Sequence, residues 1–338
     1  MHKIAHNIAT GFVVLVSSFC LIGLGQSVSA QTQQAQQLAA GNGVRISPVR
    51  TDLVINPGET RTVTMNVQNI TAASATYQVI VNDFIAGKNE TGQPSLVLDE
   101  DKFAPSHSLK RYITHVPNIT VPAEQSKDVK VTITIPKDAA GGGYFGAVRF
   151  APVDTNGQKK NVTISASVGS LLLIRVPGDI VENIKLESLD VRTAENATSA
   201  NAFFTSNKGL YAVARFKNSG NVHEQPFGKI VLKKGTKTLQ TTEINNTDPR
   251  GNALPDSIRR FSVKLDKVGF WGKYTIEGNF GYGSNGQLIT GKSNFMVIPL
   301  PLIILALLLV VGIIGAIVVV PRAIKRYNAN VLRKAGRR

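Results

Sequence analysis

Cysteine is almost absent from this chain. Its 338 residues contain a single cysteine, Cys20, which lies in an apolar stretch near the N-terminus. If that stretch is removed on export, the remaining chain can form no disulfide, thiol nucleophile or zinc–thiolate site. Its domains must then be stabilised by core burial alone. An exported chain without disulfides also favours a bacterial over an animal source.

Catalytic motifs are missing as well. The sequence contains neither His-Glu-x-x-His nor Gly-x-Ser-x-Gly. His107, His115 and His223 are too scattered to predict a metal site. The acids of 99–101 supply oxygen ligands of the kind that calcium prefers, but a solvated acidic turn is favoured because no further spaced acid follows. We predict a protein that is not an enzyme and has no cofactor or metal.

The longest apolar run lies near the C-terminus. Residues 299–320 carry no charge, and about 20 helical residues cross the hydrocarbon core of a bilayer. Seven cations and no acid follow in 321–338. Cationic flanks remain on the cytoplasmic side. We expect a plasma-membrane protein with a single transmembrane helix at 299–320, a basic cytoplasmic tail at 321–338 and extracytoplasmic domains before them.

The other end of the chain agrees with export. Residues 1–30 have a weakly basic start at Lys3, an apolar core and small residues ending at Ala30, the layout of a signal peptide. A second membrane helix is the alternative, and the shortness of the apolar core argues against it. The polar, low-complexity residues 31–43 are expected to form a disordered leader.

Positive charge is in excess. The formal net charge is +16, and the tail cations together with Lys3 account for half of it. The extracytoplasmic part is therefore moderately basic. Such a surface favours anionic wall polymers or acidic partner proteins, although simple solubility is the plainer interpretation. We expect no nucleic acid as a partner.

Residues 44–178 read as β-structure throughout. Apolar and polar residues alternate in 61–69, 77–84 and 129–135. The run in 169–178 is short enough to be a strand buried on both sides, whereas the glycines of 141–143 predict a flexible loop. No helix of ten or more residues is indicated. Many short strands with regular turns predict an immunoglobulin-like β-sandwich.

A second β unit is expected at 179–298. Turn signals separate its strands, which are predicted at 184–191, 211–216, 229–232, 238–244, 261–265, 274–280, 287–290 and 293–298. The last strand runs almost directly into the apolar run. The predicted fold class is all-β: two tandem immunoglobulin-like β-sandwiches plus one C-terminal transmembrane helix.

The first unit resembles a known family. Ile-Ser-Pro-Val at 46–49, Asp-Leu-Val-Ile-Asn-Pro-Gly-Glu-Thr at 52–60 and Val-Gly-Ser-Leu-Leu-Leu-Ile-Arg-Val-Pro-Gly at 168–178 are similar to the N-terminal domain of bacterial WxL-interacting surface proteins. This resemblance implies an exported immunoglobulin-like domain, a second β domain and a C-terminal membrane helix. It also implies binding to peptidoglycan and to partner surface proteins.

The second unit carries softer motifs. Segments 216–223 and 270–274, together with Leu254-Pro255 and Arg259-Arg260, are similar to immunoglobulin-like domains of many membrane-anchored bacterial surface proteins. Trp271 could be a recognition aromatic, but at the start of a strand the favoured interpretation is a core residue.

These observations predict a binding protein of the cell envelope. Its partner is expected to be a wall polymer, peptidoglycan or another anionic glycan, or a surface protein, bound through a strand edge or a shallow basic face. Possible members of that face are Lys127, Lys130, Lys233 and Lys234. The alternative is a membrane-tethered chaperone or accessory subunit of a secretion or adhesion assembly.

Overall fold

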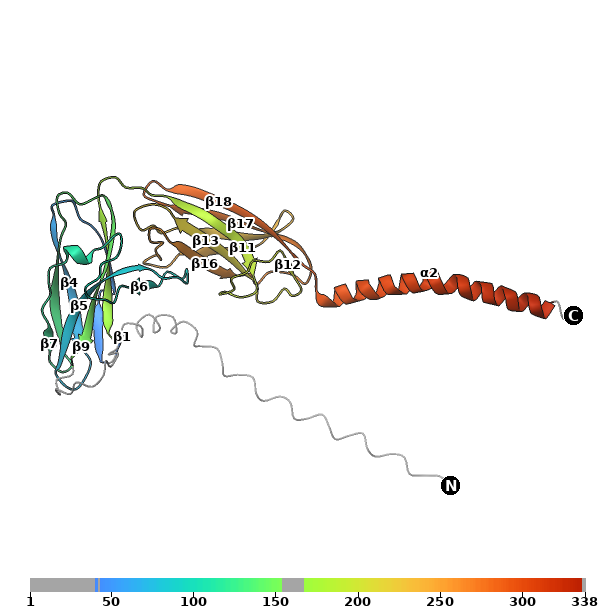
Figure 1. Ribbon diagram of the computed structural model, residues 1–338, viewed down its shortest axis with the longest axis horizontal. Helices are drawn as coiled ribbons and strands as arrows, with labels where there is room; N and C mark the ends of the chain where they lie inside the picture. The colour runs from blue at the N-terminus through green and yellow to red at the C-terminus, as the bar shows by residue number, and fades with distance from the viewer. Residues whose placement is uncertain (1–39, 42, 154–166, 336–338) are drawn as a thin grey trace, which may run out of the picture.

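The computed structural model describes residues 40–41, 43–153 and 167–335 (Figure 1). The predicted signal peptide at 1–30 and most of the predicted leader at 31–43 lie outside the described residues. At the end of that leader, Ala40 and Gly41 form a short strand that pairs with Arg45 and Val44. The last residues of the leader are therefore part of a sheet rather than of a disordered arm.

The N-terminal unit is a sandwich of two sheets. One sheet has the order β1 (Ala40–Gly41), β2 (Val44–Ser47), β4 (Thr60–Asn69) and β8 (Ser126–Thr134). The other has the order β3 (Arg50–Val54), β10 (Val168–Val176), β9 (Gly142–Pro152), β5 (Ala75–Ala86) and β6 (Pro94–Leu96), with β7 (Ile119–Val121) also paired to β5. Its only described helical piece is the 3-10 turn η1 (Lys110–Tyr112).

The core of this first sandwich follows from period-two alternation. On β4 and β8, Val63 lies opposite Val131 and Met65 opposite Val129, and all four side chains are buried. The polar residues between them face outward, because successive side chains of a strand point to opposite faces. The alternation in the sequence therefore placed these strands correctly.

The C-terminal unit is a second sandwich. Its smaller sheet has the order β11 (Ile184–Arg192), β13 (Tyr211–Asn218) and β16 (Ile258–Lys264). Its larger sheet has the order β12 (Phe203–Phe204), β18 (Gln287–Val297), β17 (Gly272–Tyr282), β14 (Phe227–Lys234) and β15 (Lys237–Ile244). Together the two units confirm the predicted all-β sandwich class.

One strand is longer than the sequence indicated. The strands predicted at 287–290 and 293–298 are a single strand, β18, which continues through Gly291. Gly291 lies opposite Gly278 on β17. A Cβ atom on Gly291 would lie 2.3 Å from Leu186 Cδ2, so the glycine lets the smaller sheet pack closely over β18. The glycine thus serves packing rather than a turn.

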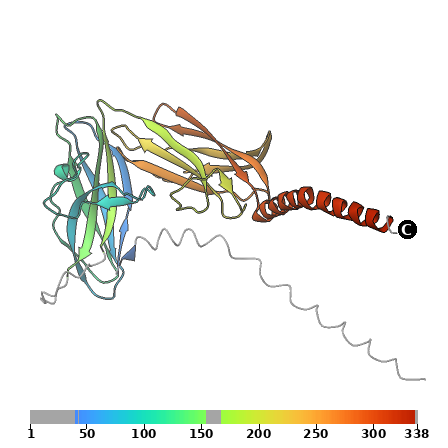
Figure 2. The same cartoon turned by 45° about the vertical axis from the view of Figure 1, so that its right-hand side comes forward.

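A long helix leaves the far end of the second sandwich. Helix α2 spans Leu300–Ala335 and extends away from both sandwiches (Figures 1 and 2). Its segment Leu300–Asn330 is long and apolar enough to cross a membrane. Only Ile298 and Pro299 separate it from β18. The helix continues through Pro321, beyond the predicted end of the apolar span at residue 320.

The two sandwiches pack against each other over an apolar cluster. Phe84, Phe145, Ala147 and Leu173 of the first sandwich are buried there with help from Leu254 of the second. This contact covers the face of β10 that points away from its own core. It explains why β10 is buried on both sides, as its continuous apolar sequence predicted.

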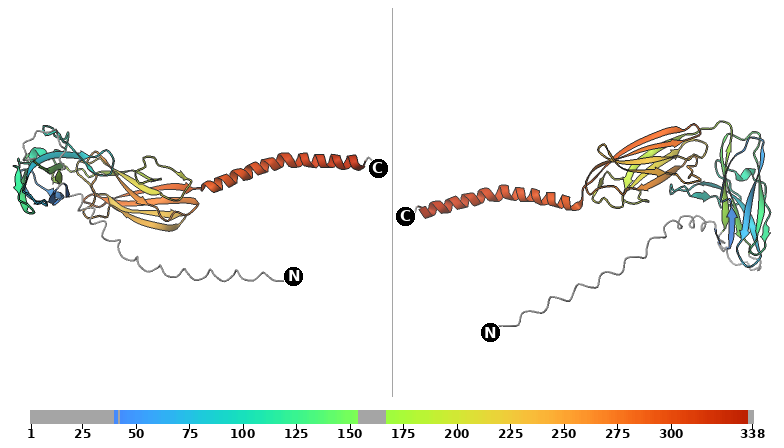
Figure 3. Two further views of the ribbon diagram at one scale, coloured as in Figure 1. Left: turned by 90° about the horizontal axis from the view of Figure 1, so that it is seen from below. Right: turned by 180° about the vertical axis from the view of Figure 1, so that it is seen from behind.

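An arm of the first sandwich reaches over the second. The β5–β6 hairpin, visible between the two units in Figures 1 and 3, places Glu90 on the smaller sheet. The Glu90 carboxylate accepts two hydrogen bonds from the Arg215 guanidinium, at 2.8 and 2.5 Å. The carbonyl of Glu90 accepts a third from the Arg260 amide at 2.8 Å. Arg259 donates to the carbonyl of Thr91.

The glycines of 141–143 form part of the same junction. A Cβ atom on Gly142 would lie 3.2 Å from the carbonyl oxygen of Asn221, and the amide of Gly143 donates to the same carbonyl at 2.7 Å. The prediction of a flexible loop is therefore wrong: β9 begins at Gly142, and the missing side chains permit the close approach of the second sandwich.

Replacing Glu90 with alanine should loosen the arm. A half-buried, bidentate Arg–carboxylate pair contributes about 1–3 kcal/mol. Trypsin should therefore cleave the folded protein after the exposed Lys88 of the arm roughly 5- to 100-fold faster in Glu90→Ala, because cleavage follows the population of the open form. Glu100→Ala, an exposed acid of the same sandwich, should leave the rate unchanged. Equal rates in wild type and Glu90→Ala would show that the pair does not hold the arm.

Candidate functional site

The four lysines suggested by the sequence do not form one face. Lys127 and Lys130 are exposed on β8 of the first sandwich, whereas Lys233 and Lys234 lie on β14 of the second. Lys233 forms an ion pair with Glu277 at 2.5 Å, and Glu277 also pairs with Lys292 at 3.1 Å. Lys234 donates to the carbonyl of Trp271 at 3.0 Å. The structure therefore places two of these residues on each sandwich.

The lysines on β8 lie beside an open strand edge. Beyond β8, only Ile113 forms a bridge, to Ile133, so the segment 126–131 pairs with no second strand among the described residues. Such an edge could accept a partner strand. Lysines on edge strands also commonly prevent unwanted pairing. Lys127 and Lys130 fit that protective role as well as a binding one.

A long loop of the first sandwich is built around one buried carboxylate. Asp83, on β5, is fully buried, and its two oxygens accept the amides of Ala104 and Lys110 at 2.9 and 2.8 Å. Its neighbour Asn82 donates to the carbonyl of Val97 at 2.8 Å. These bonds fix three points of the segment 97–112. The loop therefore has a defined shape although most of it contains no regular structure.

That loop displays an aromatic ring next to two cations, which we call the Phe103 patch (Phe103, Lys110 and Arg111). The Phe103 side chain is 41% exposed. The Arg111 guanidinium lies 4.1 Å from its ring centre and the Lys110 ammonium 5.2 Å. Cations at such distances are attracted by the face of the ring. The Lys110 ammonium already donates to the carbonyls of Glu100 and Lys102. The patch therefore offers an apolar ring and one exposed cation, Arg111, that can bind a carboxylate.

The acidic turn of the same loop is satisfied by its own neighbours. Asp99 forms an ion pair with Lys102 at 2.9 Å and accepts the amide of Asp101. Within the part of the chain that the structure describes, no group of three or more His, Cys, Asp or Glu side chains could hold a metal. The geometry thus favours the solvated-turn interpretation of 99–101.

Two of the histidines lie at the domain junction. His107 Nδ1 lies 2.6 Å from the carbonyl of Gly143, and His223 packs its ring edgewise on Phe145, with centres 5.7 Å apart. Burial lowers the pKa of His223 from 6.5 to about 4; the Asp52 carboxylate opposes this change, whereas the positive charges of Arg175 and Arg50 add to it. His223 is therefore neutral at pH 7.

An arginine and two acids complete the junction. Arg175, at the end of β10, forms ion pairs with Glu182 at 2.7 Å and Glu224 at 3.2 Å. Burial raises the pKa of Glu224 from 4.5 to about 7, and the nearby Glu182 carboxylate adds to the rise. The pKa of Glu182 is lowered instead, although burial opposes the change, because it accepts hydrogen bonds from Ser284 and Arg175. Arg175 thus pairs with one acid whose pKa is raised, Glu224, and with one whose pKa is lowered, Glu182.

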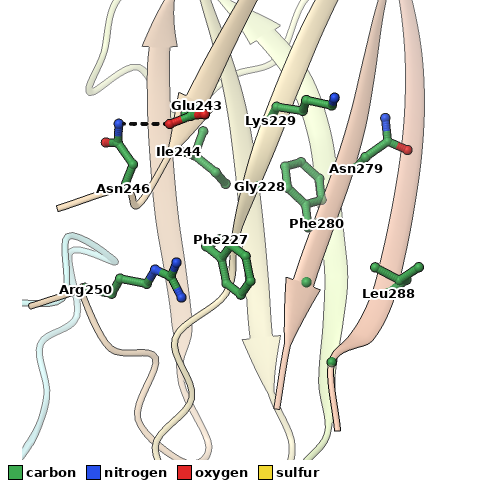
Figure 4. Close-up of a pocket in the computed structure, with 12 residues that line it drawn as sticks. Phe227, Gly228, Lys229, Glu243, Ile244, Asn246, Arg250, Asn279, Phe280 and Leu288 are labelled. Carbon is green, nitrogen blue, oxygen red and sulfur yellow. Dashed lines mark hydrogen bonds between the residues drawn. The ribbon is translucent and has the colours of Figure 1, made fainter. Parts of the chain in front are cut away.

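A groove of about 480 Å³ lies on the larger sheet of the second sandwich (Figure 4). Ile244, Phe280 and Leu288 are among its apolar residues. At one side the Arg250 guanidinium lies 3.8 Å from the centre of the Phe227 ring. Lys229 and Glu243 supply further charge, and Asn246 donates to Glu243 at 3.2 Å. The groove can hold a side chain or a small apolar group with a polar edge.

The sequence contains one motif that was not identified above. Residues 286–293 read Gly-Gln-Leu-Ile-Thr-Gly-Lys-Ser and match the spacing of a phosphate-binding loop. Such a loop needs a helix after it, whose N-terminus holds the phosphate. Here the segment is a turn followed by β18, which pairs along its length with β17. The match therefore has no phosphate-binding geometry.

The softer motifs of the second unit have a role that the sequence did not reveal. Segment 216–223 contains Asn221 and His223, and both contact the first sandwich. Leu254 enters the apolar cluster between the domains, and Arg259 and Arg260 hold the arm. These residues join the two domains. A contact between distant segments leaves no periodic signal in the sequence.

Comparison with protein families gives one match. Residues 51–152 match the family described as "WxL Interacting Protein, peptidoglycan binding domain". The match confirms the resemblance drawn from the segments around residues 46–60. It covers most of the first sandwich, including the Asp83 loop and the Phe103 patch. No curated protein matches the sequence.

Several solved structures are similar at low identity. The class 5 fimbriae chaperone CfaA is 15% identical with a TM-score of 0.36, covering 76% of this chain and 100% of its own. The chaperone YadV is 12% identical with a TM-score of 0.36, covering 75% and 100%. The E. coli chaperone DraB is 15% identical with a TM-score of 0.32, covering 75% and 97%.

Asp83 should be needed for the shape of the loop. In Asp83→Ala, two amides lose their charged acceptor, and we expect the free energy of unfolding to fall by about 2–4 kcal/mol. Asp83→Asn keeps one acceptor oxygen and should lose about half as much. Urea denaturation measures both values. Asp101→Ala, which removes an exposed acid of the same loop, is the control; a loss in Asp101→Ala equal to that in Asp83→Ala would contradict the assignment.

Glu224 should make stability depend on pH in a defined direction. Because its folded pKa of about 7 exceeds the ordinary 4.5, its contribution to the free energy of unfolding is lost as pH rises from 4.5 to 7. His223 acts oppositely: its lowered pKa contributes stability that is lost as pH falls from 6.5 to 4.

The variant Glu224→Gln separates these two contributions. Relative to wild type, its free energy of unfolding should increase between pH 4.5 and 7, by roughly 1–3 kcal/mol, and then remain constant. Thermal or urea unfolding at four pH values measures the difference. Glu100→Gln should show no such trend. A pH-independent difference between Glu224→Gln and wild type would contradict the raised pKa.

Proposed function

We propose that this chain, a member of the WxL-interacting protein family through its first sandwich, is a membrane-anchored protein that binds peptidoglycan in the bacterial cell envelope. The observation that supports the proposal is the match of residues 51–152 to the peptidoglycan-binding domain of that family. The chain acts by binding rather than by catalysis. Its domains are two sandwiches at 44–178 and 179–298, after a signal peptide at 1–30.

The proposed anchor is α2. Its first 31 residues suit a membrane span by length and composition, and the cations after residue 320 favour a cytoplasmic C-terminus. Both sandwiches then lie on the outer side of the plasma membrane. A wall polymer is available on this side of the membrane. A chain without disulfides is stabilised there by its packed cores.

The Phe103 patch is the surface of the first sandwich best suited to peptidoglycan. Peptidoglycan joins sugar rings, whose C–H faces pack on aromatic side chains, to short peptides that end in carboxylates. The ring of Phe103 offers the apolar contact, and the exposed Arg111 offers charge-assisted hydrogen bonds. The patch is rigid because Asp83 fixes the loop, so little ordering entropy is lost on binding.

The second sandwich is proposed to hold this surface away from the membrane. The Glu90–Arg215 contact and the apolar cluster join the two units at several points, so the first sandwich is presented in one orientation. The groove beside Phe227 offers a separate surface for a partner surface protein.

Sedimentation with insoluble peptidoglycan tests the proposal. Full-length protein in detergent should sediment with the polymer, and the double variant Phe103→Ala/Arg111→Ala should bind at least 10-fold more weakly, which corresponds to about 1.4 kcal/mol. The matched control is Lys127→Ala/Lys130→Ala, which removes two exposed cations from the same sandwich and should bind like wild type.

Each other result has a definite meaning. If the lysine variant loses binding and the Phe103 variant does not, the site lies on the β8 edge instead of the loop. If wild-type protein does not sediment at low or moderate salt, peptidoglycan binding is overturned. A stable stoichiometric protein partner recovered in its place would support the accessory-subunit alternative.

A further inference from the structure

The end of the second sandwich next to α2 differs from the rest of its surface. β18 ends at Val297, and α2 begins at Leu300, so about 10 Å of chain at most separates them. Gly272 at the start of β17 pairs with Val297, and Phe203 of β12 pairs with Met296. Residues next to these pairs therefore lie beside the first turn of the helix, as Figure 1 shows for β12.

Large aromatic side chains are exposed at this end. Phe203, Phe270 and Trp271 are 70%, 57% and 64% exposed. The interpretation of Trp271 as a core residue is therefore wrong. The two loops that carry these aromatics are tied together, because Asn207 donates to the carbonyl of Val268 at 2.9 Å. Exposing three aromatic rings in one place to water is costly unless something covers them.

Lysines surround the aromatics. Five exposed lysines lie on the same loops and strand ends: Lys208, Lys234, Lys237, Lys267 and Lys273. Lys234 Nζ lies 5.8 Å from the Trp271 ring centre. The acid of this region, Asp266, forms an ion pair with Lys264 at 3.0 Å. The end of the sandwich therefore combines apolar rings with uncompensated positive charge.

We propose that this juxtamembrane face binds the surface of the bilayer that α2 enters. Aromatic side chains favour the headgroup region of a membrane, and lysines near the surface are attracted to anionic lipids. Phe203, Phe270 and Trp271 enter the headgroup layer, and the lysines contact lipid phosphates. The inference rests on the proposed membrane anchoring by α2. It adds that the second sandwich itself is bound to lipid rather than suspended above it.

The position of the patch favours a membrane over a protein partner. A protein would have to bind within about 10 Å of the start of the helix, where the bilayer already occupies the space once α2 has inserted. The charge of the patch also complements anionic headgroups, whereas the proposed wall-binding surface is on the other sandwich.

The single tryptophan of the chain is a natural probe of the proposal. Full-length protein is reconstituted into vesicles of phosphatidylcholine alone or with phosphatidylglycerol. We expect the Trp271 emission to shift to the blue on reconstitution and to be quenched by lipids brominated near the headgroup. Quenching by aqueous iodide should fall several-fold relative to a detergent solution of the protein. Both effects should be larger with phosphatidylglycerol.

Two variants provide the comparison. Lys267→Ser/Lys273→Ser should reduce the dependence on phosphatidylglycerol, whereas Lys127→Ser/Lys130→Ser, which removes two exposed lysines far from the helix, should behave like wild type. Phe203→Ala/Phe270→Ala should restore part of the iodide quenching while keeping Trp271 as the reporter.

Vesicle flotation separates failure of this inference from failure of the anchor. Protein that floats with vesicles but whose Trp271 remains open to iodide and unaffected by brominated lipid overturns the lipid-bound face and leaves the anchor intact. Protein that does not float overturns both. Protection of Trp271 only after a protein partner is added would show that a protein covers this face, which also overturns the inference.

Discussion

The burial of β10 from both sides is the constraint on which the arrangement of the domains depends. Leu172 and Ile174 enter the core of the first sandwich, whereas Leu173 faces the second sandwich across Phe145 and Leu254. A strand with apolar residues on both faces needs two covers. The second sandwich provides one of them. The two units therefore depend on each other for the burial of β10 and are not independent modules joined by a linker.

Polar groups give this apolar contact its specificity. Arg175, at the end of the same strand, bonds to two acids of the second sandwich, and Glu90 reaches the other side of the junction to bond Arg215. Charged groups that leave water are stable only with matched partners. Rotation or sliding of one unit on the other would break several of these pairs together. One orientation is therefore much lower in free energy than its neighbours.

The sequence predicted what local periodicity controls. Alternation in β4 and β8 and the apolar runs of β10 and of 299–320 each predicted the correct type of element, although α2 continues beyond residue 320. Predictions from the sequence were wrong for residues whose environment depends on contacts between distant segments. The glycines of 141–143 were interpreted as a flexible loop, yet they admit the backbone of the second sandwich. Trp271 was interpreted as a core residue, yet it is exposed.

The candidate site shows the same difference between local patterns, which the sequence reveals, and contacts between distant segments, which it does not. Charge counting suggested Lys127, Lys130, Lys233 and Lys234, but the fold places them on two sandwiches and pairs Lys233 with an acid. The Phe103 patch depends on contacts from Asp83 to residues 21 and 27 positions away. No spacing of residues in the sequence predicts such hydrogen bonds. Aromatic residues next to cations in a long irregular segment are the signal that could have drawn attention to that loop.

The connection of two residues between β18 and α2 has a consequence for what the protein can reach. A flexible tether lets a binding module sample a wide volume at low effective concentration, whereas a very short one confines it to a thin shell. With α2 in the bilayer, as proposed, a stiff pair of sandwiches on so short a connection would hold the outer module at a nearly fixed height. Its partners would then be selected by their distance from the bilayer surface as much as by their chemistry.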